Sequence, residues 1–251
     1  MTRTPLIAGN WKMNTNLGEA EQLALAVVRA AAEVLDREVI IAPPFTVMGQ
    51  VADILHDSGV ILAAQNICWA EKGAFTGEIS PPMLKEMGGT MAIIGHSERR
   101  HIFGESNELI NRRLAGALEN ELAPILCIGE QLAERESGQT WSVLEEQLRK
   151  GLAGVTTIEP SKLVIAYEPV WAIGTGKTAS PPQAQEAHAF IRKLVATMYE
   201  KDIASQIRIL YGGSVVPDNV DSLMSQEDVD GALVGGAALD AESFARIIRF
   251  Q

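Results

Sequence analysis

The sequence lacks cysteine-rich motifs and long apolar runs. Its two cysteines, Cys68 and Cys127, are too few for a disulfide framework, and neither lies in a CxxC motif. No apolar run approaches the ~20 residues that cross a bilayer. The N-terminal region reaches Lys12 before any apolar run long enough for a signal peptide. We therefore expect a cytoplasmic protein with no membrane partner.

The sequence also lacks an excess of positive charge. Its 21 basic and 32 acidic residues give a net charge of −11. Binding to nucleic acid depends on neutralising phosphates, so this balance predicts no nucleic acid partner. It leaves room for one small anion, because local backbone dipoles and a few cations can outweigh the overall field.

What the sequence does contain is a repeating series of short apolar runs rich in Val, Ile and Leu. They cover residues 5–11, 39–45, 60–66, 91–97, 123–129, 163–169, 208–213 and 231–237. Polar alternation is missing from these runs, which favours strands of a parallel sheet covered on both faces.

Helical patterns lie between the apolar runs. Apolar residues at spacings of three and four mark residues 18–35, 107–120, 142–152 and 181–200, and a further helical pattern closes the chain at 243–250. Strand and helix in alternation over eight strands predict a (β/α)8 barrel. No linker divides the chain, so we expect one domain over residues 1–251.

The stretch "GTGKT" at 174–178 resembles the end of a nucleotide-binding P-loop. A P-loop needs a glycine five residues before the glycine of the Gly-Lys pair, and Trp171 stands there. The looser dinucleotide fingerprint should follow its strand directly in an early βα unit, whereas this stretch comes after six strands. We therefore expect no nucleotide cofactor.

Polar residues and glycines follow the strands, where a barrel of this kind carries its chemistry. They are Asn10, Lys12, Gln65, Asn66, His96 to Glu98, Cys127 to Glu130, Glu168, Gly212 to Ser214, Gly235 and Gly236. The last two glycine-rich ends match the position at which such barrels hold a phosphate on backbone N–H groups.

Glu168 is the candidate base. A lone glutamate at a strand end is usually solvated, but Tyr167, Pro169 and Trp171 surround this one with apolar groups. Such a frame predicts a raised pKa for the carboxyl of Glu168, and hence a stronger base.

His96 is the candidate electrophile, because among the four histidines it alone ends a strand. His56, His101 and His188 lie on or near helical segments and are expected at the surface or in packing. N–H groups of the turn that starts after His96 disfavour a charged ring. No second His or Cys is spaced as a partner ligand, so no metal is expected.

Five motifs, each at a strand end, resemble the triosephosphate isomerase family. They are "GNWKMN" (9–14), "GHSERR" (95–100), "AYEPVWAIGTGKTA" (166–179), "YGGS" (211–214) and "LVGGA" (233–237). The resemblance runs from residue 8 to the C-terminus. It implies the interconversion of dihydroxyacetone phosphate and D-glyceraldehyde 3-phosphate by proton transfer through an enediolate, without a cofactor.

The resemblance also implies a role for each site residue. Glu168 is the base, and a neutral His96 is the electrophile, in a family that is itself the known example of this pair. Lys12 supplies a cation with Asn10 beside it. Glu98 holds Lys12, and Ser97 supports the site. The phosphate is held by backbone groups of Gly174, Ser214, Gly235 and Gly236.

Residues 169–179 are expected to form a lid over the phosphate. Trp171 and Ile173 are too apolar to remain in water without cost. By resemblance, Tyr211 and Ser214 latch the closed lid, while Glu130 holds Trp171 when the lid is open. Cys127 has an acidic rather than a cationic neighbour, so we expect it to be a packing residue.

Residues 67–80 form an unusually long connection with two aromatic residues, Trp69 and Phe75, and no helical or strand period. Exposed aromatics on a projecting loop indicate an interface. The family's counterpart docks into a second subunit through the threonine that matches Thr76, so we expect a homodimer.

Two other functions remain open from the residues alone. Another phosphate-binding barrel enzyme, such as a sugar-phosphate epimerase or an aldolase, is one. A Schiff-base aldolase needs a lysine within a late strand, and residues 163–169 contain none. A binding protein on a degenerate barrel is the other, and the presence of Lys12, His96 and Glu168 argues against it.

Overall fold

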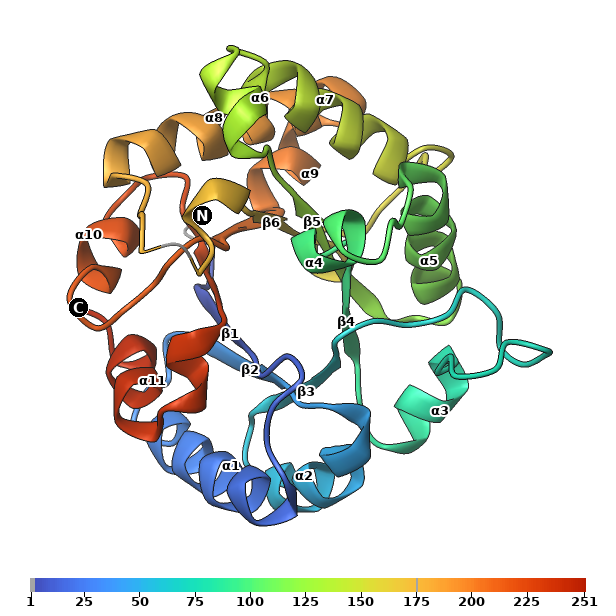
Figure 1. Ribbon diagram of the computed structural model, residues 1–251, viewed down its shortest axis with the longest axis vertical. Coiled ribbons are helices and arrows are strands. Elements are labelled where there is room, and N and C mark those ends of the chain that lie inside the picture. The colour runs from blue at the N-terminus through green and yellow to red at the C-terminus, as the bar shows by residue number, and fades with distance from the viewer. Residues whose placement is uncertain (1–2, 175) are drawn as a thin grey trace.

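Eight parallel strands close into a barrel in a computed structural model that describes residues 3–174 and 176–251 (Figure 1). The strands are β1 (Leu6–Asn10), β2 (Glu38–Ala42), β3 (Ile61–Ala64), β4 (Met91–Ile94), β5 (Ala123–Ile128), β6 (Val164–Tyr167), β7 (Arg208–Tyr211) and β8 (Gly231–Val234). They pair in chain order, and β1 pairs with β8 to close the barrel. The predicted (β/α)8 architecture is confirmed.

Helices form a ring around the strands (Figure 1). The α-helices are α1 (Leu17–Ala31), α2 (Met48–Leu55), α3 (Pro81–Glu86), α4 (Ser97–His101), α5 (Asn107–Glu119), α6 (Leu132–Glu136), α7 (Thr140–Gly151), α8 (Pro181–Met198), α9 (Lys201–Gln206), α10 (Val220–Met224) and α11 (Ala241–Ile248). The 3-10 helices are η1 (Phe45–Val47), η2 (Pro160–Lys162), η3 (Val170–Ala172) and η4 (Gly236–Leu239). In the part of the chain that the structure describes, no helix is long and apolar enough to span a bilayer.

Side chains of each strand alternate between two apolar layers. On β1, Leu6 and Ala8 point into the barrel, where they pack with Ile40 and Leu210, while Ile7 packs outward against the helices. Because both faces are covered by apolar groups, the strands show no polar alternation in the sequence. This packing fixes the strand ends on which the site is built.

The strands end earlier than the apolar runs predict, and the difference has a physical reason. Strand β2 stops at Ala42 because Pro43 and Pro44 follow and cannot donate to a ladder. Strand β6 stops at Tyr167, before Pro169. The residues beyond each strand belong to the loops that carry the polar side chains.

The long helices are close to their predicted positions, but most of the short ones were missed. Helix α8 begins at Pro181 with Ser180 as its cap, as the prolines predict. Helices α2, α3, α6, α9 and α10 have only five to eight residues each, too few to show a helical period.

Candidate active site

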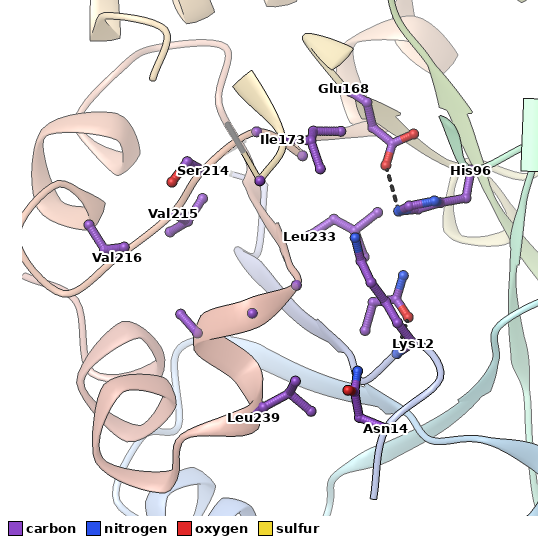
Figure 2. A pocket seen from close by; sticks show the side chains of 17 residues that line it. Lys12, Asn14, His96, Glu168, Ile173, Ser214, Val215, Val216, Leu233 and Leu239 are labelled. Carbon is purple, nitrogen blue, oxygen red and sulfur yellow. Dashed lines mark hydrogen bonds and ion pairs between the residues drawn. The ribbon is translucent and has the colours of Figure 1, made fainter. Parts of the chain in front are cut away.

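A pocket of about 350 Å³ opens at the carboxyl ends of the strands. Its lining includes the predicted site residues Asn10, Lys12, His96, Glu168, Gly174, Ser214, Gly235 and Gly236. Figure 2 shows Glu168 and His96 facing each other on one side, Ser214 on the other, and the Lys12 side chain extending between them. Residues from five different strand ends therefore meet in one small concave site, as expected for this fold.

The carboxylate of Glu168 is held by two neighbours from the end of β4. Oε2 accepts a hydrogen bond of 2.8 Å from the backbone N–H of Ser97. Oε1 lies 3.0 Å from Nε2 of His96, the contact drawn as a dashed line in Figure 2. Glu168 is only 2% exposed, so these contacts replace water around the charge.

The predicted raised pKa of Glu168 is wrong for this arrangement. Burial does raise the pKa, as the apolar frame suggested, but His96, the Ser97 N–H and Lys12 together outweigh it, so the pKa is lowered from its ordinary value. The sequence shows the apolar neighbours of Glu168 along the chain. It does not show that a hydrogen-bond donor from another strand faces the carboxylate.

The ring of His96 is oriented by the start of helix α4. The backbone N–H of Glu98 donates to Nδ1 over 3.2 Å, so Nδ1 acts as an acceptor and Nε2 carries the proton that faces Glu168. Burial disfavours a charged ring, but the carboxylate of Glu168 outweighs it and raises the pKa of His96 while the two remain paired. The hydrogen bond accepted by Nδ1 agrees with the expected neutral ring. The contact between Nε2 and the Glu168 carboxylate, by contrast, favours a charged ring.

Lys12 stands on a strained turn after β1. Its φ of 52° lies in the left-handed region, which residues other than glycine rarely adopt and which tends to occur at functional sites. Its backbone N–H donates to Oδ1 of Asn10 over 3.0 Å, and its Nζ donates to Oε1 of Glu98 over 2.6 Å. The structure thus brings Lys12 together with both residues that the sequence grouped with it.

The opposite side of the pocket consists mainly of backbone. Gly235 and Gly236 stand where β8 passes into η4, and Ser214 follows the glycine pair after β7. A Cβ added to Gly236 would meet no atom within 4 Å, so this backbone faces open space in the pocket. Such a surface of N–H groups suits an anion.

Two glycines flank Glu168 closely, and only one of them was part of a predicted motif. A Cβ at Gly129, after β5, would lie 1.7 Å from the carbonyl oxygen of Glu168. A Cβ at Gly212, after β7, would lie 2.8 Å from Cγ of Glu168. Both positions therefore require glycine for space, since neither has a positive φ. Gly129 could have been suspected only from its place after a strand.

The expected lid is anchored at both of its ends. Nε1 of Trp171 donates to Oε1 of Glu130 over 2.9 Å, the contact that the family resemblance associates with an open lid. Arg135 on α6 also donates to Glu130, and its guanidinium lies 4.7 Å from the centre of the Trp171 ring. Nothing in the sequence pattern points to Arg135. Residue 175 of the lid lies outside the described residues.

The far end of the lid contacts β7. The backbone N–H of Ala179 donates to Oη of Tyr211 over 3.3 Å. Burial raises the pKa of Tyr211 to about 12, so its phenol stays protonated at neutral pH. Gly174 and Ile173 of the lid line the pocket itself.

The loop over residues 67–80 projects beyond the ring of helices (Figure 1). Thr76 is exposed and does not line the pocket. The expected exposure of the two aromatics is wrong in part, because Trp69 and Phe75 are half-buried against each other with their ring centres 5.2 Å apart. Arg112 covers the Trp69 ring from α5, which sequence spacing could not reveal.

Other candidate residues are placed away from chemistry. Cys127 is fully buried, and burial raises the pKa of its thiol well above the ordinary value, as a packing residue requires. His188 is buried in α8 behind Tyr167 and Tyr211, while His56 and His101 are exposed. Within residues 3–174 and 176–251, no three His, Cys, Asp or Glu side chains gather where they could hold a metal ion.

Comparison with known proteins gives one consistent result. A sequence model of the family described as triosephosphate isomerase matches residues 5–251. The chain is 54% identical to the triosephosphate isomerase of Trichlorobacter lovleyi and 52% identical to that of Geobacter metallireducens, over 99% of each chain in both cases. It is 53% identical to the triosephosphate isomerase of Herpetosiphon aurantiacus, over 99% of this chain and all of the relative.

Proposed function

The chain belongs to the triosephosphate isomerase family, and from that premise we propose that Glu168, His96 and Lys12 perform its reaction. The protein interconverts dihydroxyacetone phosphate and D-glyceraldehyde 3-phosphate, a step of glycolysis and gluconeogenesis. The observation that carries the residue assignment is the meeting of a buried carboxylate, an oriented imidazole and a lysine in one pocket. Both pathways run in the cytoplasm, where cell fractionation should find the enzyme.

The reaction moves a proton between neighbouring carbons. Glu168 takes the proton from one carbon, and the electron pair of that C–H bond forms the enediolate. Nε2–H of His96 donates a hydrogen bond to the substrate oxygen as negative charge develops there, and the Nζ of Lys12 adds a positive charge nearby. Nε2 of His96 gives its proton to the former carbonyl oxygen and takes up the proton of the neighbouring hydroxyl group, and Glu168 returns its own proton to the other carbon.

Glu168 must leave its present neighbours to reach the substrate. Its pKa is lowered here by His96 and by the Ser97 N–H. When the carboxylate turns away from both, their effect fades while burial continues to raise its pKa, so the carboxylate becomes a stronger base as it meets the substrate. The same movement leaves Nε2–H of His96 free to donate to the substrate and removes the charge that raises the pKa of the ring.

The phosphate would lie on the backbone side of the pocket. Gly235, Gly236 and Ser214 offer N–H groups there, and Gly174 would join them when the lid closes. Lys12, whose Nζ is held by Glu98, would face both the phosphate and the reacting carbons.

The lid over residues 169–179 would protect the enediolate from loss of phosphate, the role for which lids in this family are known. Deletion of residues 173–176 should leave weak enediolate formation, because the base, the electrophile and Lys12 lie outside the deletion. The unprotected intermediate should then release inorganic phosphate and methylglyoxal. Clean isomerisation by the deletion variant, with no rise in methylglyoxal, would remove the protective role.

In the dimer that we propose, the loop over residues 67–80 of one copy contacts a surface beside Lys12 of the other copy. A second cavity of about 350 Å³ there is bordered by Met13 and Phe103, which are 95% and 67% exposed. Oδ1 of Asn66, another lining atom, is buried without a hydrogen-bond partner among the described residues. The loop of a second copy, led by Thr76, would cover this surface.

A variant Thr76→Glu tests the dimer by sedimentation. We expect folded monomers of low activity, because the interface would have to bury an added charge. An unchanged sedimentation coefficient would reject this interface, and Glu71→Gln on the same loop serves as the control.

The function itself is tested by incubating the purified protein with each triose phosphate in turn. We expect rapid approach to the same equilibrium mixture from both directions. A sugar-phosphate epimerase or an aldolase would leave both compounds unconverted, and so would a binding protein.

A further inference from the structure

Gln147 is a buried polar residue on the inner stripe of helix α7. The other buried residues of this helix are Thr140, Leu144, Leu148 and Gly151. Both polar atoms of its carboxamide are used on one residue: the N–H of Gly129 donates to Oε1 over 2.8 Å, and Nε2 donates to the Gly129 carbonyl over 3.1 Å. The side chain therefore binds the two peptide units on either side of Gly129, just beyond the end of β5.

Gly129 in turn supports the backbone of Glu168. The space that a Cβ of Gly129 would need lies 1.7 Å from the carbonyl oxygen of Glu168, so the two backbones are in direct contact. On either side of this contact, the N–H of Glu168 donates to the carbonyl of Ile128 over 2.8 Å, and the N–H of Val170 donates to that of Glu130 over 3.0 Å. Residues 128–130, at and just after the end of β5, thus hold the backbone of Glu168 in place.

We propose that Gln147 is a positioning residue for Glu168, acting through Gly129. The role rests on the proposed function of Glu168 as the base. The side chain of Glu168 must turn during the reaction, but its Cα must stay fixed for the carboxylate to arrive at the substrate carbon. A misplacement of ~1 Å in a reacting group can cost on the order of 100-fold in rate.

A carboxamide is suited to this task because one flat group supplies both an acceptor for the N–H and a donor for the C=O of the same residue. Two hydrogen bonds to one residue restrain both its position and its tilt. An apolar side chain of equal length would fill the same space and leave the N–H and C=O of Gly129 without partners.

The test compares Gln147→Met with Gln147→Glu. Methionine keeps the length of the side chain and removes both hydrogen bonds. Glutamate keeps the shape and the acceptor for the Gly129 N–H, and offers the Gly129 carbonyl a donor only when its carboxyl group is protonated. Glu146→Gln, on the exposed side of the same helix, is the control.

We expect Gln147→Met to lower kcat by about tenfold or more, with competitive inhibition by inorganic phosphate within twofold of the wild type. Gln147→Glu should recover part of the loss. A purely structural role would lower stability and leave the kcat of folded protein unchanged, and that result would overturn the proposal. So would an equal loss of kcat and of phosphate affinity.

A second measurement separates this proposal from the assignment of the base. In a Glu168→Asp background the carboxylate is already withdrawn, so Gln147→Met should cost less than it does in the wild type. Full additivity would show that Gln147 acts elsewhere.

If Glu168→Asp lowers kcat and neither Gln147 variant does, the assignment of Glu168 as the base stands and the positioning role of Gln147 fails. If Glu168→Asp leaves kcat unchanged, the base assignment itself fails. Should Gln147→Met not fold, the isosteric Gln147→Glu variant carries both comparisons.

Discussion

The pocket has a side-chain half and a backbone half. On the β4–β6 side, His96 and Glu168 present charged or polar side chains (Figure 2), which accept hydrogen bonds from the first two residues of α4. On the β7–β8 side, the pocket is lined by the backbone of Gly235, which lies next to Lys12, and of Gly236, which faces open space. A group that must gain and lose a proton needs a tunable pKa, whereas a group that holds a constant anion needs only fixed dipoles. Substitutions in the side-chain half should therefore affect turnover, and substitutions in the backbone half should affect phosphate binding.

The largest effect is expected where the halves meet, at Lys12. Its Nζ can face both the phosphate and the developing enediolate, and an apolar chain of similar length cannot replace the charge. Lys12→Met should lower kcat/KM by about 1000-fold or more and weaken inhibition by inorganic phosphate. Lys85→Met on the exposed side of α3 is the control. Phosphate inhibition as strong as in the wild type would show that Lys12 serves the side-chain half alone.

Glu168→Asp should damage the side-chain half alone. Loss of one methylene withdraws the carboxylate from the proton it must reach, which should lower kcat by about 100-fold. Inhibition by inorganic phosphate should stay near the wild-type value, because the backbone half is untouched. Turnover within a factor of two of the wild type would remove Glu168 as the base; Glu119→Asp on α5 controls for the substitution.

Gly236→Ala should produce the reverse pattern. The added methyl group would project into the open space where we propose that the phosphate binds, since no protein atom stands within 4 Å of it. We expect inhibition by inorganic phosphate to weaken by about tenfold, equivalent to ~1.4 kcal/mol, with kcat changed by less than twofold. Gly18→Ala on α1 is the matched control. A large fall in kcat at unchanged phosphate affinity would mean that the two halves are not separable.

His188 lies behind the place where the side-chain half and the backbone half of the pocket meet. Its titration should change the stability of the protein without changing proton transfer or phosphate binding. Burial lowers the pKa of His188 from 6.5 to about 4, so between these values the unfolded chain binds a proton that the folded chain does not. Stability from this group is therefore complete above pH 6.5 and falls as the pH decreases toward 4, by about 2 kcal/mol at pH 5.

Urea unfolding at pH 7 and pH 5 measures this loss. The loss of unfolding free energy between pH 7 and pH 5 should be smaller in His188→Gln than in the wild type. The kcat and the phosphate inhibition of folded protein at pH 7 should remain unchanged. An equal loss in both proteins would show that other groups govern acid sensitivity.

The sequence predicts the side-chain half better than the contacts that tune it. His96 and Glu168 were singled out because polar residues stand out after apolar strands, whereas the role of Lys12 came from the family resemblance; the (β/α)8 barrel followed from the repeating runs. The direction of the pKa shift of Glu168 was missed, because His96 and the Ser97 N–H, which lower the pKa, come from the end of a different strand. Gln147 was missed for the same reason: its partner, Gly129, lies 18 residues away along the chain. Only the place of Gln147 among the buried residues of α7 could have hinted at it.

The most direct test of base-mediated proton transfer is the isomerisation of D-glyceraldehyde 3-phosphate in deuterated water. A carboxylate that holds the transferred proton can exchange it with solvent, so deuterium should appear at C1 of the dihydroxyacetone phosphate formed. Glu168→Asp should form the same labelled product more slowly. Unlabelled product would indicate direct hydride transfer between the carbons, and labelled product formed at an undiminished rate by Glu168→Asp would show that another group is the base.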